Sequence, residues 1–282
     1  NGVIETAGTG LAGTVTAAGG GVYVSGVVDS GGQAVNFGFT DGQDVMTPRG
    51  SPAAYISRLG GDGSYGWTRV LNGAAAGGRS HVVDVRPAPG GGIDVLASFA
   101  GNLILDPASK TGTVRAVTAR CAFHELVTQF MPDGSYAGWV WPLSPDYNAF
   151  APDAAGNLYL AGPFQQNREY NAFNCDGRFH GPRTVYTRSA GSAVITRLNA
   201  DATYGWTRPF WSTPGGTGEG QYLLIDSTGA AYVAGSTPDP ATGMVSTEPV
   251  FLARFSTQGA MSWLRSFGGG SVCVPPCINN GA

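Results

Sequence analysis

The sequence predicts an all-β fold made of four successive units, each an antiparallel sheet of four strands. One pattern recurs four times, its apolar segments are short, and no segment has the periodicity of an amphipathic helix. The pattern is a glycine turn, a Tyr-Val-type strand, a variable insert, a further strand, a Gly/Asp turn and a strand with a tryptophan. The copies span approximately residues 11–72, 80–142, 147–211 and 220–269.

The four strands are clearest in the last copy. The first covers 221–226 and ends at the turn Ser227-Thr228-Gly229, and the second covers 231–235. The third covers 250–255 and the fourth 261–267. Val, Tyr, Leu and Trp separated by Gly, Asp and Ser are typical of half-buried strands joined by tight turns.

The other copies align with the last on the same residue types. The second strand carries a tyrosine in three copies, at Tyr23, Tyr159 and Tyr232, and Asp94 in the other. The fourth strands carry the tryptophans Trp67, Trp139, Trp206 and Trp263. A carboxylate on a central strand must reach water, a partner or an ion to avoid a large burial cost. Asp94 is therefore a candidate functional residue.

Serial four-stranded units are typical of the blades of a β-propeller, because radial packing buries both faces of each sheet and leaves only short edges. A sandwich would not need the same pattern four times. The sequence thus predicts a propeller over residues 1–270, with four blades closing one ring. A piece of a longer propeller is the alternative, because Val3–Thr6 sits where the last strand of a preceding copy would lie. Residues 271–282 are expected to form a tail with a short cysteine loop.

The segments Asp153–Gly162, Asp226–Gly235 and Val250–Gly269 resemble bacterial SBBP-type β-propeller repeats. The pattern of those repeats is D-x-x-G-N-x-Y-V-x-G followed by F-V-x-K/R-x-x-x-x-G-x-x-x-W-x-x-x-x-G-G. The resemblance covers nearly the whole chain and implies a propeller in an exported or surface protein, without implying an activity. The long inserts and Asp94 depart from the pattern.

Composition argues against nucleic-acid binding. Charged residues make up 12% of the chain, the net charge is −3, and Lys110 is the only lysine. The sequence contains no apolar run of about 18 residues, so we expect no transmembrane segment. The chain starts at Asn1 without a signal-like region, which we interpret as a mature form or a fragment.

The four cysteines indicate the compartment. Cys121 and Cys175 lie in the second-to-third connections of adjacent copies, which emerge on one face of a propeller, and Cys273 and Cys277 flank two prolines. We therefore predict the disulfides Cys121–Cys175 and Cys273–Cys277. A four-thiolate metal site is the rival, but no second CxxC faces the short pair, so no metal site is predicted. Disulfides imply an extracytoplasmic location: secreted, periplasmic or at the cell surface.

Binding residues are expected in the long connections, which all emerge at one end of the propeller. The third insert supplies Arg168, Tyr170 and Asp176, and the connections between blades supply Trp141 and Trp211. Aromatic rings beside polar groups suit a sugar or a peptide. The competing interpretation is that these rings pack the loops onto the rim.

Acidic residues complete the candidates. We expect Asp94 to line the central channel near Asp84 and Arg86. Calcium held by channel oxygens is the one cofactor considered, although no D-x-D-x-D-G loop supports it. Five aspartates are expected to hold turns through bonds to backbone N–H groups: Asp62, Asp133, Asp153, Asp201 and Asp226.

The sequence favours a non-catalytic extracytoplasmic propeller. It would bind a glycan, a peptide or a partner protein on its long-loop face, or serve as a structural subunit of a bacterial surface assembly. The alternative is a propeller-type carbohydrate-active enzyme, a lyase or glycoside hydrolase. Such an enzyme needs two carboxylates within roughly 5 to 10 Å at the channel mouth, and the sequence contains no specific catalytic motif.

Overall fold

The computed structural model describes residues 9–38, 44–49, 52–73, 78–100, 102–105, 116–118, 124–143, 147–164, 192–201, 203–212, 218–236 and 250–267. These residues form strands and turns, with one 3-10 turn at Pro89–Gly91 and no α-helix among them. The predicted all-β class is confirmed. In this part of the chain, no helix has the length and apolar character needed to cross a membrane.

Sixteen of the strands form four antiparallel meanders in sequence order, which we call units one to four. Unit one contains β1 (Thr9–Ala18), β2 (Gly21–Asp29), β5 (Ala53–Gly60) and β6 (Tyr65–Gly73). Unit two contains β7 (Arg79–Pro87), β8 (Ile93–Ala100), β11 (His124–Phe130) and β12 (Tyr136–Leu143). Unit three contains β13 (Ala149–Pro152), β14 (Leu158–Phe164), β15 (Ser192–Leu198) and β16 (Tyr204–Ser212). Unit four contains β17 (Glu219–Ile225), β18 (Ala231–Ser236), β19 (Val250–Phe255) and β20 (Met261–Phe267).

The strands predicted for the last copy are confirmed to within two residues at each end. Two short hairpins lie in the inserts: β3 (Val35–Asn36) pairs with β4 (Val45–Met46), and β9 (Asn102–Ile104) pairs with β10 (Ala116–Thr118). The second hairpin extends the edge of β6.

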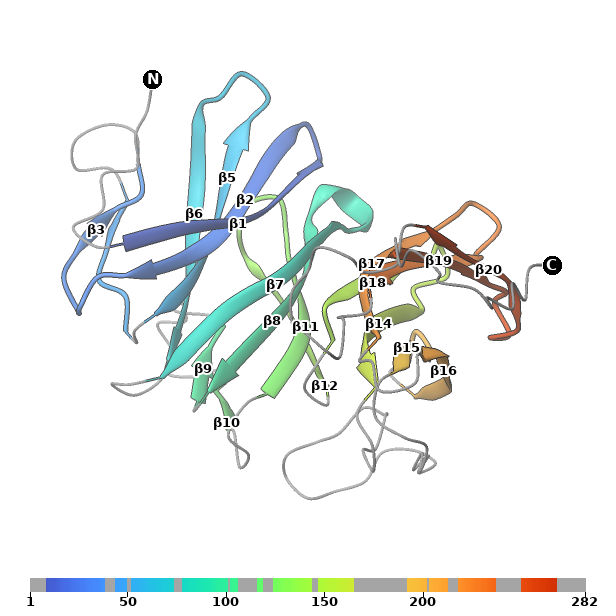
Figure 1. Ribbon diagram of the computed structural model, residues 1–282. Helices are drawn as coiled ribbons and strands as arrows, with labels where there is room; N and C mark the ends of the chain where they lie inside the picture. Colours follow the sequence, from blue (N-terminus) through green and yellow to red (C-terminus); the bar gives the residue numbers. More distant parts are fainter. Residues whose placement is uncertain are drawn as a thin grey trace.

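The units follow one another in space as they do in sequence, with the first and last at opposite ends of the row (Figure 1). Their first strands adjoin in succession: β1 lies against β7, β7 against β13, and β13 against β17. A bridge between Pro163 and Glu219 joins units three and four into one curled sheet.

Each unit packs face to face against the next, so three apolar seams form the core. Cross-strand neighbours share a face of a sheet. The face that carries Tyr23 and Ile56 in unit one is turned toward unit two, where it meets Val95 and Phe130. We call this the forward face of a unit, and the face that it meets the receiving face of the next unit. Equivalent clusters fill the other two seams.

Neighbouring units are also joined by a repeated polar contact. Trp67 Nε1 donates to the carbonyl of Pro132 at 2.9 Å, and Arg69 Nε donates to the carbonyl of Gly134 at 2.7 Å. The same contact recurs between units three and four, where Trp206 Nε1 donates to Thr257 at 3.0 Å and Arg208 Nε to Gly259 at 3.1 Å. The tryptophan of one unit thus docks onto the third-to-fourth turn of the next.

The predicted turn role of the aspartates is confirmed. The carboxylates of Asp62, Asp133 and Asp201 each accept a bond from the backbone N–H two residues on, at 2.9, 2.8 and 3.0 Å. Asp153 and Asp226 make the same bond in the first turns. Such bonds stabilise the charged form: the Thr228 hydroxyl, together with the backbone N–H groups of Ala230 and Thr228, holds the pKa of Asp226 at about 2.

A candidate binding pocket between units two and three

Two of the three seams are filled by the same aromatic and cationic side chains. In the first seam, Tyr23 and Trp67 meet edge to face with ring centroids 5.8 Å apart, and the Arg58 guanidinium lies 5.9 Å from the Tyr23 ring. The third seam repeats this with Tyr159, Trp206 and Arg197 at nearly identical separations. A large ring and a long cation therefore occupy this level of the seam.

Unit two carries different residues at the tyrosine and arginine positions that face the second seam. Asp94 takes the place of the tyrosine, and Gln129 pairs with Asp94 across the strands as Arg58 pairs with Tyr23. The arginine two residues after the docking tryptophan is replaced by Trp141. Three positions of the repeated pattern thus change together on one face of one unit.

A pocket of about 750 Å³ lies where the filling is reduced. This volume falls within the range of about 300–1,000 Å³ that is usual for small-molecule sites. Unit two and the segment leading out of β7 supply one wall and unit three supplies the other. The lining residues are Pro87, Ala88, Asp94, Val127, Gln129, Trp141, Pro152, Asp153, Ala154, Gly156, Leu158 and Ala200.

Asp94 is the one lining carboxyl that is buried and not bound into a turn. It is 7% exposed, and Gln129 Nε2 donates to its Oδ1 at 3.1 Å. Burial raises the pKa of Asp94 to about 7, and the bond from Gln129 opposes that rise. At neutral pH this carboxyl can therefore accept hydrogen bonds as an anion or donate one as an acid.

The rest of the lining is apolar or already bonded. Asp153 accepts bonds from the backbone N–H groups of Ala155 and Asn157 and from the Asn157 side chain, at 2.8–2.9 Å. Trp141 is half-buried against the apolar cluster of the seam. No lysine, arginine or histidine is among the named lining residues. The pocket therefore favours a neutral or basic ligand over an anion.

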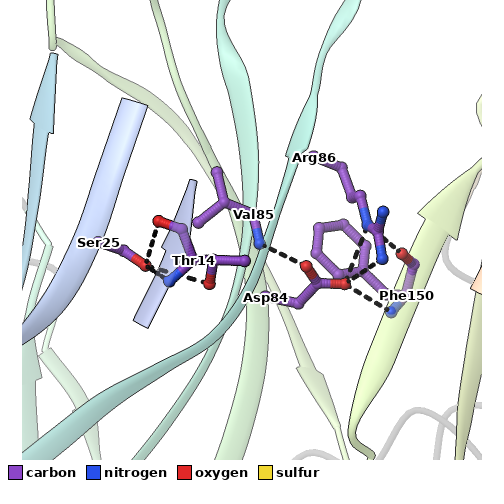
Figure 2. Close-up of polar contacts among 6 residues, drawn as sticks. All are labelled: Thr14, Ser25, Asp84, Val85, Arg86 and Phe150. Atoms are coloured by element: carbon purple, nitrogen blue, oxygen red, sulfur yellow. Dashed lines mark hydrogen bonds and ion pairs between the residues drawn. The ribbon is translucent and has the colours of Figure 1, made fainter. Parts of the chain in front are cut away.

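A polar clamp at the inner strands fixes the two walls relative to each other (Figure 2). Arg86 Nε donates to the Phe150 carbonyl at 3.0 Å, and the Phe150 N–H donates to Asp84 at 3.4 Å. Asp84 and Arg86 form an ion pair of 2.8 Å. Burial raises the pKa of Asp84, while Arg86 and the backbone donors oppose that rise. This clamp joins β7 to β13, so the two walls of the pocket are held together by their inner strands.

The structure brings Asp94 and Trp141 into one pocket. Residues of the tight turns of units two and three also line it, among them Ala88, Ala154 and Ala200. Arg86 pairs with Asp94 across strands β7 and β8. Its guanidinium engages Asp84 and the Phe150 carbonyl, while the hydrogen-bond partner of Asp94 is Gln129. Trp141 was expected in a connection between blades, and this was wrong. It lies within β12 and pairs with Val127, because backbone pairing continues to Leu143.

Trp211 likewise lies within the backbone of β16, and its side chain lies outside the described part. The remaining predicted residues also lie outside the described residues: Arg168, Tyr170, Asp176, Cys121, Cys175, Cys273 and Cys277. The long-loop binding face and both disulfides therefore stay predictions.

Gln129 is the pocket residue that sequence reasoning missed. The signal was present, since the aligned third strands carry Arg58, Arg197 and Arg254 at this position. Comparing the copies position by position would have identified the loss of an arginine beside the loss of a tyrosine.

No family model and no curated protein matches this sequence. Among the described residues, no group of three or more His, Cys, Asp and Glu side chains is placed to hold a metal ion.

Proposed function

We propose that this protein is an extracytoplasmic β-propeller of SBBP-type repeats that binds a glycan without catalysis. The four units are its blades. Their meander topology, the succession of their first strands and the face-to-face seams support this architecture. The ligand site is the pocket between units two and three.

The observation that carries this proposal is the replacement of the seam filling in unit two alone. An aromatic face and a hydrogen-bonding carboxyl-amide pair replace a tyrosine and two arginines at Asp94, Gln129 and Trp141. A sugar ring has an apolar face that stacks on an indole and hydroxyls that bond to carboxylate and amide groups. Neutral and amino sugars fit this lining, whereas an acidic sugar would meet Asp94 beside Arg86, whose guanidinium is already paired with Asp84.

The geometry favours binding over hydrolysis. Glycoside hydrolysis requires two functional carboxyl groups flanking the scissile bond. The other lining carboxylate, Asp153, accepts three hydrogen bonds from its own turn. The lining contains no other carboxyl group that could act with Asp94.

The test is glycan binding by the native protein and by a variant that restores the repeat pattern. The double substitution Asp94→Tyr and Gln129→Arg refills the seam with the side chains found in the other units. We expect a glycan array to identify neutral or amino sugars for the native protein. Calorimetry with those sugars should show affinity at least about tenfold weaker for the double variant, whose folding remains intact.

Asp226→Asn is the matched control, because it removes a half-buried carboxylate at a turn of unit four that does not line the pocket. Its glycan affinity should equal that of the native protein. The proposal fails if no glycan binds, or if the refilled variant binds as tightly as the native chain.

The proposed location has a separate test. Peptide mapping of the unreduced protein, purified from an oxidising compartment, should recover Cys121 linked to Cys175 and Cys273 linked to Cys277. Four free thiols in that material would contradict the extracytoplasmic assignment, because structural disulfides persist in such compartments.

A further inference from the structure

The forward face of unit four is apolar and exposed. Leu224 lies opposite Tyr232, and Val250 lies opposite Phe267, so these residues share the face that carries Trp263. Leu224, Val250 and Phe267 are 63%, 49% and 56% exposed. Tyr222 on the same face is 68% exposed.

Two of these positions, Val250 and Phe267, have buried counterparts in units that are followed by another unit. Leu71 of unit one and Phe210 of unit three correspond to Phe267, and they are 1% and 7% exposed. Ala54 and Ala193 correspond to Val250 and are fully buried. The forward face of unit four therefore has the apolar composition of a seam but, among the described residues, no following unit packs against it in this structure.

The polar part of the joint is also unoccupied in unit four. Trp263 and Arg265 stand where Trp67 and Arg69 stand in unit one. Within the described ranges, neither Trp263 Nε1 nor Arg265 Nε donates to an acceptor. Arg265 Nη1 donates to the carbonyl of the preceding residue, Leu264, at 3.1 Å, and Arg69 and Arg208 make the same local bond in the formed joints.

Unit one presents the complementary surface. A Cβ atom at Gly134 or Gly259 would lie 2.7 Å from the docked tryptophan ring, whereas one at Gly63, in the equivalent turn, would meet nothing within 4 Å. On the receiving face, Val15 is 65% exposed, and its counterpart Val85 in unit two is 3% exposed.

The insert of unit one covers the other half of this face. Val35 and Phe37 pack there against Val28 and Tyr55. A docked unit would therefore contact the half next to the Gly63 turn.

We propose that unit four docks onto unit one of a second copy of this chain, using the joint already formed twice within the chain. The first and last units lie at opposite ends of the row (Figure 1), so unit one of the same copy does not cover this face. This contact is heterologous, since two different surfaces meet. Two copies joined at both ends would close a ring of eight units, the upper end of the common propeller range.

Two substitutions at exposed positions test the joint from its two sides. Phe267→Asp places a charge on the donor surface, and Val15→Asp places one on the acceptor surface. Met131→Asp is the matched control, because Met131 is 40% exposed and lies at a turn of unit two, on neither surface. Circular dichroism and thermal unfolding establish that each variant is folded.

Size-exclusion chromatography with light scattering should give the native protein and Met131→Asp a mass of at least two chains at about 1–100 µM. Each of the other variants should be monomeric, with self-affinity at least about tenfold weaker. An equal mixture of Phe267→Asp and Val15→Asp should contain a heterodimer, because one intact joint forms between them. A native protein that is monomeric throughout this range, or variants whose mass matches the native protein, would overturn the proposal.

Discussion

The buried carboxyl of Asp94 should make the protein less stable as the pH rises from about 4 to about 7. The folded chain raises the pKa of Asp94 from 3.8 to about 7, chiefly through burial. Between these two values the folded state binds more protons than the unfolded state, so stability falls as pH rises. Asp94→Asn removes this titration and keeps an acceptor for Gln129.

The size of the effect follows from the two pKa values. The difference between 3.8 and about 7 corresponds to a loss of about 4 kcal/mol in the free energy of unfolding once the pH is above both values. This is an upper bound for a group beside a pocket. We expect Asp94→Asn to match the native protein within about 1 kcal/mol at pH 4 and to be about 2–4 kcal/mol more stable at pH 8.

Urea unfolding followed by circular dichroism at several pH values measures this difference. Asp133→Asn is the control of opposite sign, because bonds from Ser135 lower the pKa of Asp133. That variant should lose stability at neutral pH and approach the native protein below the folded-state pKa. A pH-independent difference for Asp94→Asn, or a loss of stability at pH 8, would refute the burial argument.

Two further experiments test the joints between units. Gly134→Ala should cost more stability than Gly63→Ala, by about 1–3 kcal/mol, since both residues have φ near +80° but only the Gly134 position abuts Trp67. Thermal or urea unfolding of both proteins checks this, and equal losses would mean that the ring moves aside freely. Trp206→Phe should cost about 1 kcal/mol or more, because it removes the bond to Thr257 and part of the ring. Unchanged urea unfolding would show that this joint does not contribute to stability.

The local features were predictable from the sequence because they repeat. Alternating apolar residues located the strands of unit four, and the recurring aspartates located the tight turns. Both depend on residues within a few positions of one another, so one copy supports the interpretation of the next.

The pocket could not be predicted, because it depends on pairing register and on the contact between units. Asp94, Gln129 and Trp141 lie on three strands, and only the pairing of β8, β11 and β12 brings them together. The expectation for Trp141 was wrong because turn residues alone do not show how far pairing continues. The opposite wall comes from unit three, whose residues are too far from Asp94 in the sequence for a local pattern to connect them.

The joint between units has a consequence for how such a chain can grow. Its acceptors are main-chain carbonyls, so Pro132 and Thr257 serve equally well despite different side chains. A gene segment encoding one unit encodes both the tryptophan that docks onto the next unit and the turn that accepts the tryptophan of the previous unit. Duplication of that segment inserts a compatible unit without compensating changes on either side. The inserts and the seam fillings are then free to diverge, as the Asp94 seam has done.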